Sequence, residues 1–189
     1  KSGARFDEKR LLWLNGAHVR NIPVDKLYEY VSPQDDNSQK NWGQTGFWPE
    51  SAYAPNITKE YRMKVLALAQ DRLKMFEDLR GFGYFFAEPE INMELIDGNK
   101  QLKKLSDSER HELLETASQE LAKLTDWTPE SIQNCLNELL ETTGQKPGIL
   151  FSLIRIAVTW APFSPQLNDT LALIGKEKTL RRLDTYLDS

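Results

Sequence analysis

Apolar residues recur every three or four positions along most of the chain, which is the spacing of one face of an α-helix. The clearest stripe runs over 58–80 and consists of Val65, Leu68, Ala69, Leu73, Phe76 and Leu79. It predicts one long helix that ends at Gly81 and Gly83. We find no alternating strand pattern of useful length and no internal repeat, so the pattern predicts an all-α fold.

Shorter helices are predicted before this stripe. Asp7 is suited to cap a first helix, which Gly16 would end, and Pro23 favours a second helix over 24–31. Residues 32–56 are rich in Pro, Gly, Asn, Asp and Ser, which indicates a long irregular connection. The large aromatic residues in it are Trp42, Phe47, Trp48 and Tyr53. We therefore expect this connection to pack against other parts of the chain.

The second half carries explicit helix boundaries. Ser106 and Glu109 form a capping box, which opens a helix to about Leu124. Thr128 caps the next helix, and Gly144 closes it. Three further helices are predicted over 149–158, 167–174 and 176–187. The first of the three is almost wholly apolar, so we expect it to lie at the centre of its unit.

Composition excludes several classes of protein. The chain has 189 residues, 40% of them hydrophobic and 28% charged, as in ordinary globular domains. No apolar run approaches the roughly 20 residues of a membrane-spanning helix. One cysteine and two histidines cannot build a zinc cluster, and we predict no metal site. The single cysteine fits a reducing compartment. The chain starts at Lys1 without Met or a signal-peptide pattern, so we expect an excised fragment.

Charge is distributed unevenly. The net charge of −4 by itself argues against a nucleic-acid-binding protein. Residues 107–141, however, carry nine acidic and two basic residues, a net of −7, whereas residues 142–182 carry six basic and two acidic residues, a net of +4. The second segment is therefore a candidate surface for an anionic ligand.

We predict no catalytic residue. The sequence contains no glycine-rich phosphate loop and no spacing typical of a nucleophile with its base. We expect His18 and His111 to be surface or packing residues and Cys135 to be a small core residue. Glu88 and Glu90, which flank a proline, are most simply a solvated turn.

Several cations remain open to two interpretations. Arg155 lies in the middle of the apolar helix, where an unpaired charge would cost several kcal/mol. It must pair with an acid, which physical grounds favour, or contact a ligand. Lys176, Arg181 and Arg182 either form a solvated face or hold phosphates, and Arg72 on the long helix is open to the same alternatives.

Three ordered segments resemble glutamyl-tRNA synthetases. Residues 1–16, KSGARFDEKRLLWLNG, are similar to the segment K-S-x-A-x-F-D-x-x-K-L-x-W-x-N that follows the catalytic domain of this family. Residues 68–86 resemble its next helical unit. Residues 146–183, with RIAVT, PQL, LALIGKE and LRRL in that order, resemble its C-terminal signature. The three matches span essentially the whole chain.

This resemblance implies the end of a stem-contact region over 1–45, followed by helical anticodon-binding units over 46–98 and 99–189. The implied partner is the glutamate tRNA, bound by a monomer in a bacterial-type cytoplasm or an organellar matrix. In this family an upstream catalytic domain makes glutamyl-adenylate with ATP and Mg²⁺. The ATP-binding signatures of that domain are absent here, so we expect no cofactor in this fragment and no aminoacylation by it alone.

The resemblance also implies site residues. Those expected to contact the anticodon are Arg72, Arg155, Ser164, Leu167 and Asn137, and those expected to contact phosphates are Lys176, Arg181 and Arg182. A planar guanidinium both stacks on unpaired bases and hydrogen-bonds their edges. Several residues depart from the family pattern, and two of them bear on this site. Trp160 stands where relatives usually have glycine, and Asn137 stands where some have arginine.

Two alternatives belong to other classes of protein. The first is a helical protein-interaction or scaffold domain that uses the acidic face over 107–141. The second is an autonomous enzyme, which would need catalytic residues that the sequence does not show. Binding of tRNA that weakens steeply with salt distinguishes the tRNA-binding interpretation from the scaffold, because phosphate contacts release counterions.

Overall fold

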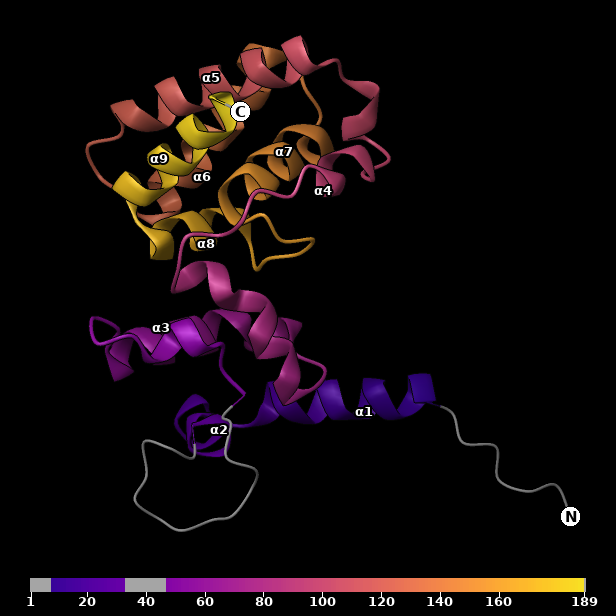
Figure 1. Cartoon of the computed structure of the whole chain (residues 1–189), viewed down its shortest axis with the longest axis vertical. Helices are drawn as coiled ribbons and strands as arrows, with labels where there is room; N and C mark the ends of the chain where they lie inside the picture. Colours follow the sequence, from indigo (N-terminus) through magenta and orange to yellow (C-terminus); the bar gives the residue numbers. More distant parts are fainter. Residues whose placement is uncertain (1–7, 33–46, 189) are drawn as a thin grey trace, which may run out of the picture. The chain divides into compact units, whose positions relative to one another are not determined.

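The computed structural model describes the backbone of residues 8–32 and 47–188, and the side chains within these ranges from Asn15 onward (Figure 1). These residues form helices and connections and no strand, in agreement with the predicted all-α fold. The chain divides into two compact units, which we call unit 1 (Lys1–Ala87) and unit 2 (Glu88–Ser189). The boundaries predicted at 45 and 98 separate a stem-contact region from two anticodon-binding units, and this division stays a prediction.

Unit 1 combines α-helices with 3₁₀ segments. Its α-helices are α1 (Glu8–Asn21), α2 (Val24–Val31) and α3 (Lys59–Ala69). Its 3₁₀ segments are η1 (Glu50–Tyr53), η2 (Gln70–Arg72) and η3 (Phe76–Phe85). The predicted helix over 24–31 is confirmed, with Pro23 at its N-cap.

The prediction that Gly16 ends the first helix is wrong, because α1 continues through it to Asn21. A Cβ added at Gly16 would lie 3.4 Å from the Leu73 carbonyl oxygen and 3.6 Å from Lys74 Cα. This glycine therefore allows another backbone segment to approach α1 closely, and it does not stop the helix.

The prediction of one helix over 58–80 is also wrong. The α-helix ends at Ala69, Leu73 is extended (φ −74°, ψ 129°), and η3 then runs through both Gly81 and Gly83. Two interactions stabilise the break. The Gln70 amide donates to the carbonyl oxygens of Val19 in α1 and of Ile22 just after it. The Asp78 carboxylate accepts from the backbone N–H groups of the two residues just before η3, at 2.8 and 3.0 Å.

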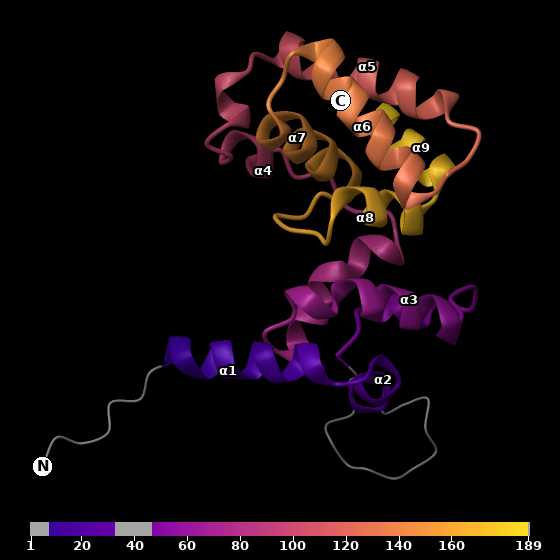
Figure 2. The same cartoon turned by 180° about the vertical axis from the view of Figure 1, so that it is seen from behind.

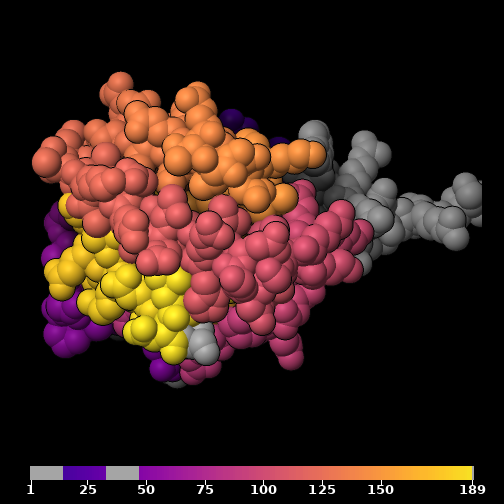
Figure 3. Space-filling model, turned by 90° about the horizontal axis from the view of Figure 1, so that it is seen from above, coloured from indigo at the N-terminus to yellow at the C-terminus, as the bar shows by residue number. Residues whose placement is uncertain are grey.

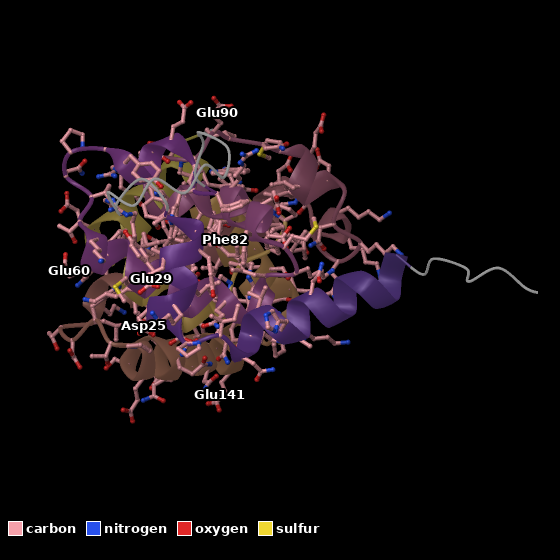
Figure 4. The ribbon with its side chains drawn as sticks, turned by 90° about the horizontal axis from the view of Figure 1, so that it is seen from below. Asp25, Glu29, Glu60, Phe82, Glu90 and Glu141 are labelled. Atoms are coloured by element: carbon pink, nitrogen blue, oxygen red, sulfur yellow. The ribbon has the colours of Figure 1, made fainter. Side chains whose placement is uncertain are left out.

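Aromatic side chains fill much of unit 1. Trp48 is buried, donates from Nε1 to Ser32 Oγ at 2.7 Å, and meets Phe86 edge-on at 5.6 Å between ring centroids. This confirms that the irregular connection packs on the unit at this residue, whereas Trp42 lies outside the described residues. Phe82 is fully buried and lies among packed side chains in Figure 4, where Glu60 points outward at the edge.

Unit 2 is built of more regular helices. They are α4 (Glu94–Asp97), the 3₁₀ turn η4 (Leu102–Lys104), α5 (Asp107–Lys123), α6 (Pro129–Thr143), α7 (Pro147–Thr159), α8 (Leu167–Ile174) and α9 (Lys176–Leu187). The capping box of Ser106 and Glu109, the cap at Thr128 and the left-handed stop at Gly144 (φ 66°) are all present as predicted.

Helix α7 packs against α5, α6 and α9, as expected of a central helix (Figure 2). Six of its apolar residues are buried: Leu150, Leu153, Ile154, Ile156, Ala157 and Val158. On the face of unit 2 seen in Figure 3, the side chains of α5 lie between those of α6 and α9. Within the described ranges, no helix is long and apolar enough to cross a membrane.

Candidate functional site

Arg155 and Ser164 lie together at the end of α7. The Arg155 side chain is half-buried, and its Nε donates to Ser164 Oγ at 2.8 Å. The same hydroxyl donates to the Pro165 carbonyl oxygen at 2.9 Å. Because a guanidinium is planar, a bond from Nε to a buried partner sets the direction in which its plane faces. The structure thus brings together two residues that the sequence predicted as one site.

The loop between α7 and α8 begins with an unusual backbone conformation. Trp160 is left-handed (φ 45°, ψ 37°), and within the described residues it is the one non-glycine residue with positive φ. This conformation costs an L-residue roughly 1–2 kcal/mol, whereas glycine adopts it without this cost. Here the tryptophan is 8% exposed and stacks on Tyr186 at 5.8 Å between centroids, and these contacts offset the strain.

The other residues predicted at the anticodon lie in different surroundings. Leu167, the first residue of α8, is buried, as is Ser164. Asn137 is exposed on α6, where its Oδ1 accepts from Gln133 Nε2 at 2.9 Å. Arg72 is exposed at the end of η2, in unit 1. The structure therefore groups Arg155, Ser164 and Leu167 around one loop and places the other two elsewhere.

The three cations predicted to contact phosphates all have protein partners. Lys176 donates to the carbonyl oxygens of Ala122 and Leu124 at the end of α5, both at 2.7 Å. Arg181 and Arg182 both bond the Glu88 carboxylate, Arg182 through Nε at 2.9 Å. Their contact with phosphates stays a prediction. Of the two arginines, Arg181 has the more exposed side chain, at about half of its surface.

Glu88 is not the simple solvated residue that the sequence suggested. It joins Arg181 and Arg182, and Arg182, only 4% exposed, also donates from Nη1 to the Val158 carbonyl oxygen in α7 at 3.0 Å. Partial burial raises the pKa of Glu88, but the hydrogen bonds and charges of Arg182 and Arg181 outweigh it, so that the pKa is lowered. The cluster therefore connects the first residue of unit 2 to α9 and to the helix that carries Arg155.

His18, His111 and Cys135 lie in the kinds of surroundings that the sequence predicted. His18 is exposed, and His111 is partly buried, with Nδ1 2.9 Å from the Asp107 carbonyl oxygen and its ring tilted against Tyr186. Cys135 is buried. Its burial, and to a smaller extent the nearby glutamates, raise the pKa of its thiol to about 11, so it stays protonated at neutral pH. The described part of the chain contains no group of three His, Cys, Asp or Glu residues suited to a metal ion.

Sequence reasoning missed Arg62. This residue lies inside unit 1 and is 7% exposed. It donates from Nε to the Tyr28 hydroxyl at 2.8 Å and from Nη1 to the Ala52 carbonyl oxygen at 3.1 Å. Its guanidinium also lies over the Tyr53 ring. One signal was available, because Arg62 lies three residues before Val65 and so on the apolar face of α3. Its role is structural, since it joins segments that are distant in sequence.

A family model described as an anticodon binding domain matches residues 26–187. Among similar curated proteins, the glutamate–tRNA ligase of Chloroflexus aurantiacus is 30% identical over 183 residues, which cover 96% of this chain and 35% of the relative. That of a Roseiflexus species is 32% identical over 188 residues, which cover 97% of this chain and 34% of the relative. The chain thus spans about a third of the length of these relatives.

A solved structure supports the same fold. The crystal structure of a glutamate tRNA ligase from Elizabethkingia meningosepticum aligns with all of this chain and 34% of its own, with a TM-score of 0.69 and 21% identity. The corresponding synthetase of Elizabethkingia anophelis aligns with a TM-score of 0.65 and 19% identity. At these identities the likeness concerns the fold alone, and it covers every element described above.

Proposed function

Because this chain belongs to the anticodon binding domain family, we propose that it binds the anticodon arm of the glutamate tRNA and that Arg155 reads an anticodon base. The observation that carries the proposal is the bond from Arg155 Nε to the buried Ser164 hydroxyl within the matched region. A guanidinium whose plane is oriented beforehand loses less entropy when it hydrogen-bonds the edge of an unpaired base.

The neighbouring residues have complementary roles in this proposal. Ser164 and Leu167 are buried, so they act by holding the loop in place and, in the case of Ser164, by bonding Arg155. Asn137 on α6 and Arg72 on η2 are exposed and contact RNA in this proposal. The amide of Asn137 is neutral and shorter than the arginine that some relatives have there. Lys176 and Arg181 hold the phosphate backbone, and Arg182, which is only 4% exposed, contributes through its positive charge.

We also propose the larger setting of this chain. The protein to which it belongs is a cytoplasmic, monomeric ligase that attaches glutamate to tRNA with ATP and Mg²⁺. The chemistry belongs to a catalytic part outside these 189 residues, and the present chain alone is inactive in aminoacylation. The similarity to glutamate–tRNA ligases over nearly the whole chain supports this setting.

The test compares two anticodon stem-loop RNAs, one with the glutamate anticodon and one with a single anticodon base changed. Arg155→Ala should weaken binding of the cognate RNA by about 1–3 kcal/mol and affect the altered RNA less. Ser164→Ala should produce a smaller loss in the same direction, because the guanidinium is still present but no longer oriented. Lys123→Ala on the acidic helix α5 is the matched control, since its side chain pairs with Glu120.

Two results would contradict the proposal. An equal loss for both RNAs would exclude direct reading by Arg155. Absence of measurable binding of the wild-type chain at low salt would exclude tRNA binding itself and favour the scaffold interpretation. Binding through phosphates should also weaken linearly in log affinity against log salt concentration.

A further inference from the structure

Unit 1 contains a shallow hollow of about 320 Å³ between the last two turns of α1 and the start of η3, which we call the α1–η3 hollow. The two segments lie side by side in both side views (Figures 1 and 2). They can approach because Gly16 has no side chain, since a Cβ there would lie 3.6 Å from Lys74 Cα. None of the residues that line the hollow is among those predicted to contact RNA.

The apolar part of the lining comes from Val19, Met75 and Phe76. The Phe76 ring is held by two other rings, because Tyr30 stacks on it at 6.5 Å between centroids and Phe47 meets it edge-on at 5.3 Å. Met75 beside it is 42% exposed. A fixed ring next to a polarisable thioether is an apolar surface that a flat molecule can cover at little cost in conformational entropy.

The polar part of the lining carries both donors and acceptors. It consists of the amide of Asn15, the imidazole of His18, the ammonium of Lys74 and the carboxylate of Glu77. All four residues are exposed, and their side chains are not hydrogen-bonded or ion-paired to any residue that the structure describes. These groups are therefore available to the edge of a ligand.

Charge favours an anionic ligand on unit 1 over unit 2. Unit 1 contains 13 Lys or Arg and 11 Asp or Glu residues, a net of +2, and unit 2 contains 11 and 17, a net of −6. Lys74 lines the hollow, and a Cβ at the adjacent Gly16 would lie 3.3 Å from Arg20 Nη1. Two cations therefore lie close to the hollow and can attract a phosphate.

We propose that the α1–η3 hollow holds one unpaired nucleotide of the tRNA, with its base on Met75 and Phe76 and its phosphate towards Lys74 and Arg20. This inference rests on the proposed function. A nucleobase has an apolar π-face and an edge with both donors and acceptors, which matches the two parts of the lining. A purely aliphatic ligand would desolvate the polar groups without bonding them, so it fits less well.

The first test follows the methionine methyl signals of the full 189-residue chain by NMR. The chain has three methionines, of which Met75 lines the hollow, Met63 lies on α3 and Met93 lies in unit 2. With ¹³C-methyl labelling, addition of the glutamate tRNA should move the Met75 signal upfield, because a stacked base exerts a ring current on it. Met63 is the internal control and should not move.

The two histidines of the chain allow a second comparison in the same sample. His18 lines the hollow, whereas His111 lies on α5 and its ring packs against Tyr186. The imidazole signals of His18 should shift when the tRNA binds, and those of His111 should stay in place. His18→Gln and His111→Gln assign the two sets of signals.

Substitutions then measure the contribution of the hollow to affinity. Phe76→Leu removes the ring and should weaken tRNA binding about 5- to 100-fold. Met75→Ala removes exposed apolar surface without touching the aromatic stack, and it should weaken binding in the same direction if Phe76→Leu proves to be unfolded by thermal denaturation. Lys74→Ala should lower the salt slope of log affinity by about one phosphate contact. Lys64→Ala, an exposed lysine on α3, is the matched control and should bind like wild type.

Free nucleotides distinguish an RNA site from a site for a small molecule. CMP, UMP, AMP and GMP should move the Met75 and His18 signals only at much higher concentration than the tRNA, because they lack its other contacts with the chain. If a mononucleotide moves these signals and the tRNA does not, the hollow binds free nucleotides and its assignment to RNA is wrong.

Three further outcomes would overturn the inference. If the tRNA binds while Met75 and His18 stay unchanged, the hollow is not used and the proposed function still stands. If the Met75 signal moves with protein concentration in the absence of RNA, a second copy of the chain covers the hollow instead. If the tRNA does not bind at low salt, both the inference and the proposed function are wrong.

Discussion

Different kinds of interaction stabilise the interior of unit 1 and the interior of unit 2. In unit 1, polar side chains bond segments that lie far apart in sequence. Arg62 joins α3 to Tyr28 and Ala52, and Gln70 reaches back to the carbonyl oxygens of Val19 and Ile22 at 2.8 and 2.7 Å. Buried groups of this kind are costly to leave without a partner, so removal of either side chain leaves its own partners unsatisfied.

In unit 2, most of the structure comes from helices capped by their own neighbours and packed through apolar faces. Ser106 and Thr128 cap α5 and α6 within three residues, and α7 places fully buried apolar residues against three other helices. The long-range polar links of unit 2 include the cluster of Glu88, Arg181 and Arg182 and the bonds from Lys176 to the end of α5. Unit 1 should therefore be sensitive to the loss of single polar groups, and unit 2 to the loss of apolar volume.

The largest effect is expected from a cavity in unit 2. Leu153 is fully buried in α7, and Leu153→Ala should destabilise the folded state by about 2–5 kcal/mol, because apolar contacts are lost and the space is only partly refilled. Native-state hydrogen exchange would show the loss in the amides of α5, α7 and α9. Lys123→Ala, at an exposed position, should change stability by less than about 0.5 kcal/mol.

The second-largest loss of stability is expected from removal of a buried polar link in unit 1. Arg62→Met keeps much of the aliphatic volume but leaves the Tyr28 hydroxyl and the Ala52 carbonyl oxygen with one partner fewer, at a cost of about 2–3 kcal/mol. Hydrogen exchange should accelerate in α2 and α3. If this variant is as stable as wild type, unit 1 does not depend on its polar links, and the contrast between the units is wrong.

The Glu88 cluster should give a smaller effect that depends on pH. Glu88→Gln weakens both arginine contacts and should cost about 1–2 kcal/mol at pH 7, a value reduced by the half-exposed position of the carboxylate. The pKa of Glu88 is lowered in the folded state, so its contribution is present above the unfolded pKa of about 4.3 and is lost as the pH falls through the folded value.

Urea denaturation of both proteins between pH 7 and pH 3 measures this dependence. The difference in unfolding free energy between wild type and Glu88→Gln should shrink below about pH 4.3. Glu90→Gln, two residues away and exposed, is the control and should remain close to wild type at pH 7. A difference that stays constant with pH would show that the charge of Glu88 does not matter.

The smallest effects are expected at two matched helix caps. Thr58 Oγ1 accepts from the Tyr61 N–H at 3.2 Å in unit 1, and Thr128 Oγ1 accepts from the Ser131 N–H at 3.3 Å in unit 2. Replacement of either by alanine should cost about 1 kcal/mol, because the orphan N–H loses its partner. Thermal unfolding that shows equal losses would confirm that the two units agree in local capping, which leaves the long-range links as the place where they differ.

The outcome of the sequence predictions follows the same contrast. In unit 2 the predicted boundaries at Ser106, Thr128, Gly144 and Gly175 agree with the structure, because capping and positive φ are decided by residues within one turn. In unit 1 the apolar stripe over 58–80 predicted a continuous helix, and the structure breaks it at Leu73. Periodicity reports which residues are buried, and it does not report where a backbone must turn to bury them.

The candidate site shows the same limit. Arg155, Ser164 and Leu167 were predicted from a family resemblance, and the structure adds a hydrogen bond from Arg155 Nε to Ser164 Oγ. The long-range partners of Arg182 and the α1–η3 hollow could not be read from the sequence, since both depend on how helices and loops pack.

The sequence by itself determined the all-α class, the capped helices of unit 2, the apolar central helix and the resemblance to glutamyl-tRNA synthetases. These features depend on residue type, spacing and neighbours within a few positions. Only the tertiary structure decided that Gly16 admits a crossing backbone, that Gln70 and Asp78 stabilise a break in the predicted long helix, and that Glu88 connects two arginines. The reason is that each depends on groups brought together across many residues, whose energy is gained only once the surrounding fold has formed.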